Sequence, residues 1–277
     1  MTEIKSELLV LLRRHDLLRA ALFAGHVQNP EFNDAPFVEL VMEMAARIWH
    51  LCARSQYDPI KKAEAINRIL YKEYGFEGKS EQHKQIIDDP DRYYVHRVLE
   101  KKIASPLTLT LLYSIMAEQV GLDYEILALP SYYLIRIKGI KEEFYIDPFD
   151  GGKFLGPEDF QKKFRLAMNR NRILSTNIFE RINGSQLIAR LIQQLKHIYI
   201  LKGNAIEALR AVELLTCIFP QSPELTRDRG ILYCEMEYFS RAMIDLKDYL
   251  KSRPTADDVN EIKKLTTMLK GYREILN

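Results

Sequence analysis

Apolar positions that recur every three or four residues predict a series of amphipathic helices in the first hundred residues. Two such stripes fall within 8–22 and 37–48. A third begins at Pro59, where proline suits the first turn of a helix. Acids and a proline at 88–91 precede the apolar positions of 94–99, which predicts another helix whose amino end is stabilised by capping and by the helix dipole. The first part of the chain is therefore expected to be largely helical.

The pattern changes after residue 104. Ser105 and Pro106 predict a helix start, and the following residues are apolar nearly all round as far as Gly121, so this helix is expected to be buried and central. Runs rich in Ile, Leu, Tyr and Phe then predict three short antiparallel strands at 123–130, 132–138 and 144–146. A turn of sequence Asp-Pro-Phe-Asp-Gly-Gly closes the segment at 147–152.

The last third of the chain contains an internal repeat. Three pairs of like residues lie 34 positions apart: Tyr199 and Tyr233, Ala208 and Ala242, Pro220 and Pro254. Thirty-four residues is the tetratricopeptide period, in which each unit is a pair of helices. Two units are few for such an array, so a final helix at 256–276 is expected to cover one end. The predicted domains are 1–183 and, after Asn183-Gly184, 184–277.

Composition narrows the functional classes. Among 277 residues, 40 Lys and Arg against 38 Asp and Glu give a net charge of +2, which favours neither nucleic acid nor anionic lipid as a partner. The apolar cluster at 1–12 is interrupted by charges and predicts neither a signal peptide nor a membrane span, so a cytoplasmic location is expected. Cys52, Cys217 and Cys234 lie far apart without metal-binding spacing and are interpreted as packing residues.

The segment 105–152 is laid out like a papain-type active site without its reactive side chains. Cysteine catalysis needs a thiolate, commonly at a helix amino end, a histidine beside it, and an acid that orients the imidazole. Here the sequence supplies the helix end and the acid Asp147. No cysteine lies between Cys52 and Cys217, and no histidine lies between His96 and His197.

Several short motifs occur in a fixed order along residues 60–255. They are Tyr74-Gly75-Phe76, Asp89-Pro90, Val98-Leu99-Glu100-Lys101-Lys102, the helix 106–121, Leu129-Pro130, Tyr145-Ile146-Asp147-Pro148-Phe149-Asp150-Gly151-Gly152 and Arg227-Asp228-Arg229-Gly230. In this order the chain resembles the SirB-type bacterial proteins, which join a transglutaminase-like domain to tetratricopeptide repeats. The resemblance implies an α+β, mostly helical fold: a papain-like or transglutaminase-like core, in which a helix packs on a small antiparallel sheet, followed by an α-helical repeat tail.

The resemblance also locates a triad in this sequence. Members of the family show Gly-His-Phe where this chain has Ser131-Tyr132-Tyr133, and Gly-Ile-Pro where it has Ala104-Ser105-Pro106. The triad histidine therefore maps to Tyr132, the cysteine of active transglutaminases maps near Pro106, and the acid maps to Asp147. A phenol, with a reference pKa of about 10, is protonated near pH 7 and cannot serve as the general base.

These observations predict a catalytically inactive transglutaminase-like protein, needing no cofactor or metal, that works as a regulatory module binding a protein or peptide. The vestigial cleft would comprise Ser105, Pro106, Tyr132 and Asp147, and the tail would recruit a partner through Tyr199, Asp228, Arg229 and Tyr233. For two of these residues a second interpretation stays open, in which Asp228 and Arg229 form a salt bridge that joins the two domains.

The sequence is also consistent with two other functions. In one, the protein is a hydrolase or acyltransferase with Ser105 as nucleophile, Asp147 as acid and His96 as base; in another, it is a purely structural subunit of an assembly. A divalent-metal site formed by Asp88, Asp89, Asp91 and His96 is disfavoured, because the acids suit a helix start. The basic stretch at 162–172 is interpreted as a solvated helix face.

Overall fold

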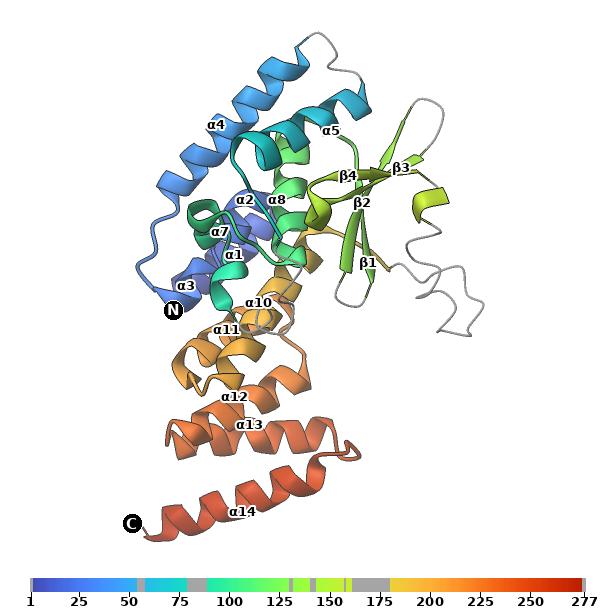
Figure 1. Cartoon of the computed structure of the whole chain (residues 1–277). Helices are drawn as coiled ribbons and strands as arrows, with labels where there is room; N and C mark the ends of the chain where they lie inside the picture. The colour runs from blue at the N-terminus through green and yellow to red at the C-terminus, as the bar shows by residue number, and fades with distance from the viewer. Residues whose placement is uncertain are drawn as a thin grey trace. The chain divides into compact units, whose positions relative to one another are not determined.

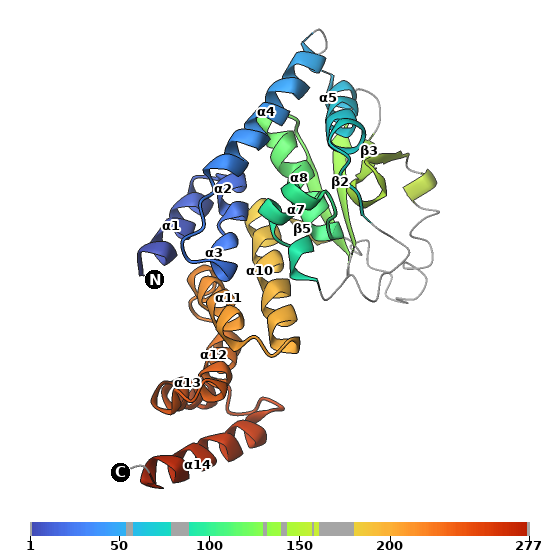
Figure 2. The same cartoon turned by 60° about the vertical axis from the view of Figure 1, so that its left-hand side comes forward.

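The computed structural model (Figures 1 and 2) describes most of the chain. The described residues are 2–53, 58–78, 89–129, 132–139, 143–156, 158–160 and 180–275, with side chains described from 6 to 271 within these ranges. The predicted basic face at 162–172, the acid Asp88, and the residues Pro130, Ser131 and Pro157 lie outside them.

Two compact units make up the chain. The sheet unit comprises 11–25 and 31–191, and the tail unit comprises 1–10, 26–30 and 192–277. The predicted boundary at 183/184 coincides with the first residue of helix α10 (Gly184–Leu201), whereas the division between the units falls inside this helix. The tail unit also includes two early segments of the chain, and the guanidinium of Arg210 donates a hydrogen bond to the carbonyl of Val27 in one of them (3.2 Å).

Helices dominate the first hundred residues, as predicted. They are α1 (Thr2–Arg13), α2 (Leu17–Leu22), α3 (Gly25–Gln28), α4 (Ala35–Cys52), α5 (Pro59–Asn67), the π-helical turn η1 (Arg68–Glu73), the 3₁₀ turn η2 (Pro90–Arg92) and α7 (Val95–Lys101). Pro59 opens α5 as expected, with Asp58 as its N-cap. The prediction that the acids near residue 90 cap α7 is wrong. Asp89 instead caps η2, and α7 begins only after Tyr94.

Helix α8 (Pro106–Gln119) is the core of the sheet unit. The Ser105 side chain accepts a hydrogen bond from the backbone N–H of Thr108 (3.1 Å), which satisfies one of the free donors at the helix start. Every residue from Leu107 to Ala117 is buried, so the helix is enclosed on all sides, as its uniformly apolar sequence predicts. Its contacts with β2 place it against the sheet.

The sheet has five antiparallel strands in the order β4-β3-β2-β1-β5. The three predicted strands are β1 (Glu125–Leu129), β2 (Tyr132–Lys138) and β3 (Glu143–Asp147). The edge strands β4 (Lys153–Leu155) and β5 (Glu180–Ile182) were not predicted. Each has only three residues, too few to show an alternating pattern. In the described part of the chain, no helix combines the length and apolar composition that crossing a bilayer requires.

The tail unit continues as successive helices (Figure 1). They are α11 (Ala205–Ile218), α12 (Pro223–Glu235), α13 (Phe239–Ser252) and α14 (Val259–Ile275). Neighbours from α11 to α14 pack on one another. Ala208 and Ala242, the repeated small residues, are completely buried. A Cβ added to Gly230 would lie 2.8 Å from the Leu246 side chain, so glycine lets α12 approach α13 closely. The helix-pair repeat predicted from the 34-residue period is confirmed.

Candidate functional site

The amino end of α8 carries the hydroxyls of the vestigial cleft. Ser105 and Thr108 are both buried, and their side-chain oxygens lie 2.9 Å apart, within hydrogen-bond distance. The Thr110 hydroxyl donates to the carbonyl of Pro106 (2.8 Å). These hydroxyls are therefore engaged in capping and in bonds within the first turns of the helix, which is the structural role that helix-start serines usually have.

Tyr132 and Asp147 meet across the neighbouring strands β2 and β3. Asp147 is completely buried, and its Oδ1 accepts the backbone N–H groups of Phe149 (3.2 Å) and Asp150 (3.1 Å). The Tyr132 hydroxyl donates to Asp147 Oδ2. Asp147 is thus a turn acid that holds two backbone amides. The residue that maps to the triad histidine is hydrogen-bonded to the one that maps to the triad acid.

Sequence reasoning did not identify two polar residues near this pair, Asn67 and Tyr71. Asn67 Nδ2 donates to the carbonyl of Gly152 (2.6 Å). Within the described part of the chain, the buried hydroxyl of Tyr71 has no hydrogen-bond partner. Burial raises the pKa of Tyr71, and the nearby Tyr113 and Asp147 raise it further. Because Asn67 and Tyr71 are separated from 147–152 by about eighty residues, no local signal in the sequence could have placed them here.

Asn67 and Tyr71 lie so close to Gly152 that a side chain at this position would collide with them. Gly151 and Gly152 both have positive φ, +64° and +73°, so alanine at either position is strained by about 1 kcal/mol or somewhat more. At Gly152 the new Cβ would also lie 2.1 Å from Asn67 Oδ1 and 2.7 Å from Tyr71 Cε2, whereas nothing lies within 4 Å at Gly151. Gly152→Ala is expected to lower the free energy of unfolding by about 1–3 kcal/mol more than Gly151→Ala, measured by urea denaturation. Equal losses of unfolding free energy in the two variants would show that position 152 is not in tight contact with Asn67 and Tyr71.

His96, the base of the alternative triad, is enclosed by aromatic rings. Its ring centroid lies 4.6 Å from that of Phe32, 5.2 Å from Tyr94 and 5.6 Å from Phe37, and the residue is 5% exposed. The pKa of His96 is lowered to about 4, mainly by burial and also by the charge of Arg97, against the opposing effects of Glu100 and Asp91. An imidazole in this environment is neutral near pH 7 and packs as an aromatic ring.

Asp89 and Asp91, two acids of the disfavoured metal site, have other partners. Asp89 caps η2 and lies near Arg92 (3.5 Å), while Asp91 pairs with Lys101. Among the residues that the structure describes, no group of three His, Cys, Asp or Glu side chains is placed to hold a metal ion.

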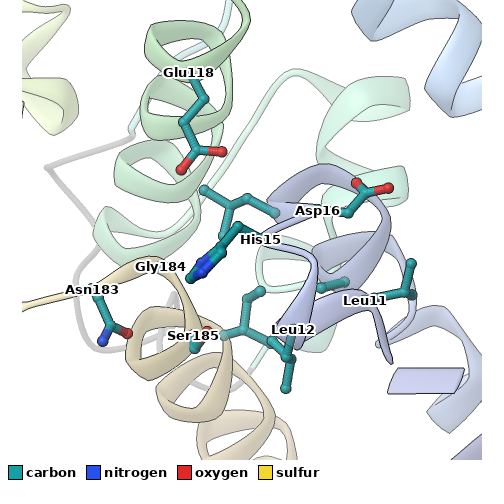
Figure 3. A pocket seen from close by; sticks show the side chains of 11 residues that line it. Leu11, Leu12, His15, Asp16, Glu118, Asn183, Gly184 and Ser185 are labelled. Carbon is teal, nitrogen blue, oxygen red and sulfur yellow. The ribbon is translucent and has the colours of Figure 1, made fainter. Parts of the chain in front are cut away.

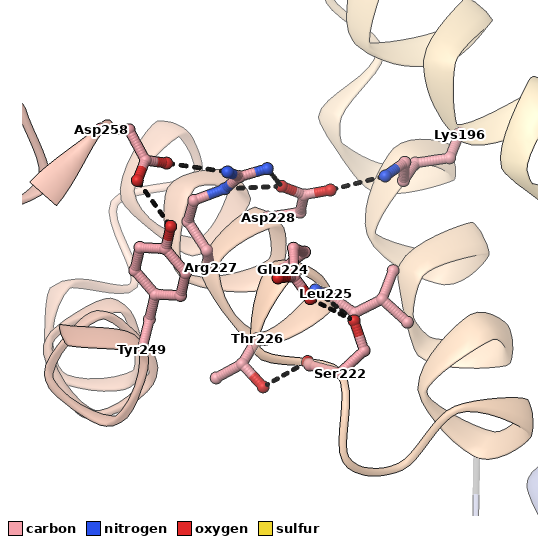
Figure 4. Close-up of polar contacts among 9 residues, drawn as sticks. All are labelled: Lys196, Ser222, Glu224, Leu225, Thr226, Arg227, Asp228, Tyr249 and Asp258. Atoms are coloured by element: carbon pink, nitrogen blue, oxygen red, sulfur yellow. Dashed lines mark hydrogen bonds and ion pairs between the residues drawn. The ribbon is translucent and has the colours of Figure 1, made fainter. Parts of the chain in front are cut away.

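Two of the predicted partner-binding residues of the tail, Asp228 and Arg229, form ion pairs within the tail unit, and those of Asp228 are drawn in Figure 4. Asp228 accepts a hydrogen bond from Lys196 Nζ (2.5 Å) and another from the Arg227 guanidinium (2.7 Å). Arg229 forms two bonds of 2.7 Å with the carboxylate of Asp245. The interpretation of Asp228 and Arg229 as a bridge between the two domains is therefore wrong for the described part of the chain, where the partners of both residues lie on α10, α12 and α13.

The two tyrosines of the same predicted surface are also packed. Tyr199 is 4% exposed, and the Tyr233 ring lies edge-on to that of Tyr238 at 6.2 Å. The repeated aromatic residues thus contribute to packing in the helical tail. Binding of a partner by Tyr199, Asp228, Arg229 and Tyr233 stays a prediction.

Comparison with known proteins identifies two segments. Residues 37–193 match the family model described as transglutaminase-like superfamily, and residues 195–267 match the tetratricopeptide repeat. A UPF0162 protein of Xylella fastidiosa is 23% identical over 250 residues, covering 89% of this chain and 87% of that protein. Protein SirB1 of Salmonella typhimurium is 22% identical over 217 residues, covering 78% of each chain. No solved structure matches.

These relatives confirm the SirB-type resemblance drawn from the motifs, and the two matched segments confirm the predicted order of a transglutaminase-like domain and a repeat tail. The first match spans more than half of the 277 residues. The chain therefore belongs to the transglutaminase-like superfamily.

Proposed function

We propose that this chain is a catalytically inactive member of the superfamily that acts in the bacterial cytoplasm as a regulatory module, binding a protein or peptide without a cofactor. The combination of a transglutaminase-like domain with tetratricopeptide repeats supports a binding module, since paired-helix arrays offer extended surfaces for partners. The vestigial cleft and the repeat tail are the two surfaces proposed for the partner.

The observation that carries the proposal is the hydrogen bond from Tyr132 to Asp147. An orienting acid normally holds the imidazole that accepts the nucleophile's proton. Here the acid holds a phenol, which has no vacant proton site near pH 7. The cysteine position is also occupied by residues without a thiol, Ser105 and Pro106. The vestigial site retains polar groups, the Tyr132 hydroxyl and the Asp147 carboxylate, without the base and thiolate needed for acyl transfer.

Two further contacts weigh against the rival hydrolase. The Ser105 hydroxyl is buried and bonded to the first turn of α8, and His96 is packed among aromatic rings. A serine nucleophile requires a base within hydrogen-bond reach and access to substrate.

Covalent probes test the absence of catalysis. We expect reactive amide, ester and thioester probes to leave the full-length protein unlabelled, as detected by intact-protein mass spectrometry. Ser105→Ala is the matched variant, since losing the cap costs only about 1 kcal/mol and should leave the fold intact. Labelling of the wild-type chain that disappears in Ser105→Ala would establish an enzyme and overturn the proposal.

Variants of the two surfaces test partner binding. The full-length chain is used as bait in an extract of its native cell, beside Tyr238→Ala and Ile244→Ser on the tail and Tyr132→Phe in the cleft. Tyr238 is 50% exposed and Ile244 is 61% exposed, so their loss should leave the core unchanged. We expect capture of one defined partner to fall at least fivefold in either the tail variants or the cleft variant, measured by quantitative mass spectrometry. A partner captured equally by all four proteins would exclude both surfaces.

A further inference from the structure

A pocket of about 100 Å³ lies in the sheet unit, away from the vestigial cleft (Figure 3). Its lining comes from the end of α1, the turn after it, α2, the carboxyl end of α8 and the start of α10, and includes Leu11, Leu12, His15, Leu17, Glu118 and Gly184. Glu118 is one residue from the end of α8, whereas Ser105 precedes its first residue. The pocket is therefore at the opposite end of this helix from the cleft.

A second hollow of about 270 Å³ shares part of this wall. His15, Asp16, Leu17 and Glu118 line both, and Val38 and Met42 of α4 add apolar surface to the second. A cavity of roughly 10–15 Å³ holds a single water molecule, so either hollow has room for a group of several heavy atoms.

Glu118 is the carboxylate that this wall offers to a ligand. Its Oε1 accepts a hydrogen bond from Tyr124 (3.0 Å), which uses one of about four acceptor positions on a carboxylate. Burial raises the pKa of Glu118 and Asp16 raises it further, while the Tyr124 hydrogen bond and His15 lower it. The Glu118 side chain is also exposed to solvent, so a cation can reach its ionised carboxylate and stabilise it.

The second acid of the wall, Asp16, already has partners. Asp16 caps α2 by accepting the backbone N–H of Arg19 (3.0 Å). The Arg19 guanidinium in turn lies 3.3 Å from Asp34 Oδ2. Among the described residues Asp16 has Arg19 as an ion-pair partner (3.9 Å), whereas Glu118 forms no ion pair with a lysine or arginine, so complementarity favours a cationic ligand.

His15 is held in an unusual backbone conformation beside this acid. Its φ is +55°, in the left-handed region that a histidine adopts at some energetic cost. Figure 3 shows the imidazole in the middle of the pocket, next to Gly184, with the Glu118 carboxylate pointing toward it. The ring therefore presents a flat surface to a ligand between the acid and the apolar side chains.

We infer that this pocket binds an aliphatic guanidinium, the chemistry of an arginine side chain, with its charged head at Glu118 and its hydrocarbon stem on the leucine side chains. A guanidinium is planar and weakly hydrated, pairs with carboxylates through two parallel bonds, and stacks on flat rings such as that of His15. Its apolar stem suits a wall that includes Leu11, Leu12 and Leu17. The guanidinium is carried either by a small molecule or by an exposed arginine of a peptide.

Titration of the full-length protein by ¹H–¹⁵N NMR tests this inference. The probes are n-butylguanidinium, the peptide acetyl-Leu-Arg-Leu-amide, and n-butyrate as an anionic control. We expect shifts of the backbone amides of His15, Glu118 and Gly184 with a Kd on the order of 1 mM for n-butylguanidinium, as befits a ligand of eight heavy atoms. A Kd for the peptide at least tenfold lower would identify a peptide source, and a Kd equal or higher a small-molecule source.

Glu118→Gln is expected to weaken binding at least tenfold, because the amide cannot balance the guanidinium charge. Glu64→Gln, which removes an exposed acid paired with Lys61 outside the pocket, should leave the Kd unchanged. Absence of shifts at 20 mM n-butylguanidinium, equal shifts with n-butyrate, or an unchanged Kd in Glu118→Gln would each overturn the inference. None of these results bears on the proposed inactivity of the cleft, because Ser105 lies at the other end of α8.

Discussion

Asp228→Ala is expected to lower the free energy of unfolding of the tail unit by about 3–5 kcal/mol. Lys196 and Asp228 are nearly buried, with side-chain exposures of 9% and 12%, and their bond joins α10 to α12. Removing the carboxylate leaves the Lys196 ammonium in a poorly solvated position without its counter-ion, and also removes one partner of Arg227. The cost is therefore that of an uncompensated charge rather than that of a single surface contact.

Urea denaturation combined with hydrogen exchange of α12 amides would measure this loss within the tail unit itself. Asp248→Ala is the matched control, because Asp248 and its partner Lys251 are mostly exposed, and its effect should stay within about 0.5 kcal/mol. Adding Lys196→Met to Asp228→Ala should recover at least half of the loss, since an apolar side chain of similar length tolerates burial. Equal effects of Asp228→Ala and Asp248→Ala would contradict the role assigned to the buried pair.

Stability is expected to fall by about 3 kcal/mol as the pH decreases from about 6.5 to about 4, through His96. The pKa of His96 is lowered from 6.5 to about 4 in the folded protein, so between these values the unfolded chain binds a proton that the folded chain does not. The contribution of the neutral ring is fully present above pH 6.5 and is lost progressively as the pH falls to about 4. Urea denaturation at half-unit pH steps would measure it.

Carboxylates also titrate in this range, so the comparison is made between variants. His96→Phe keeps an aromatic ring among Phe32, Phe37 and Tyr94 and should show a decrease smaller by about 3 kcal/mol. His50→Phe changes an exposed histidine and should retain the wild-type slope. Identical slopes in all three proteins would mean that His96 is solvated and titrates near its ordinary pKa.

Much of the site follows from local sequence. Ser105-Pro106 predicts the start of α8 because an N-cap hydroxyl and a first-turn proline act within one turn of the chain. The pairing of Tyr132 with Asp147 follows almost as directly, since consecutive antiparallel strands joined by a short connection are neighbours. The 34-residue repeat likewise predicts helix pairs from spacing alone.

Other assignments depended on contacts between distant parts of the chain. Tyr71 and Asn67 meet the turn at 147–152, and His96 is surrounded by rings that include one more than sixty residues earlier in the chain. The three-residue strands β4 and β5 are stabilised by their ladder partners and carry no pattern of their own.

The sequence by itself determined most of the elements, their order, and the absence of a cysteine and a histidine from 97–196, because capping, periodicity and residue identity are local properties. Only the tertiary structure decided which charges are neutralised and which remain available. It pairs Asp228 with Lys196 inside the tail unit, encloses His96, and brings Glu118 beside His15 across a hundred residues. Electrostatic energy depends on distance and burial, and neither can be read from separation along the chain.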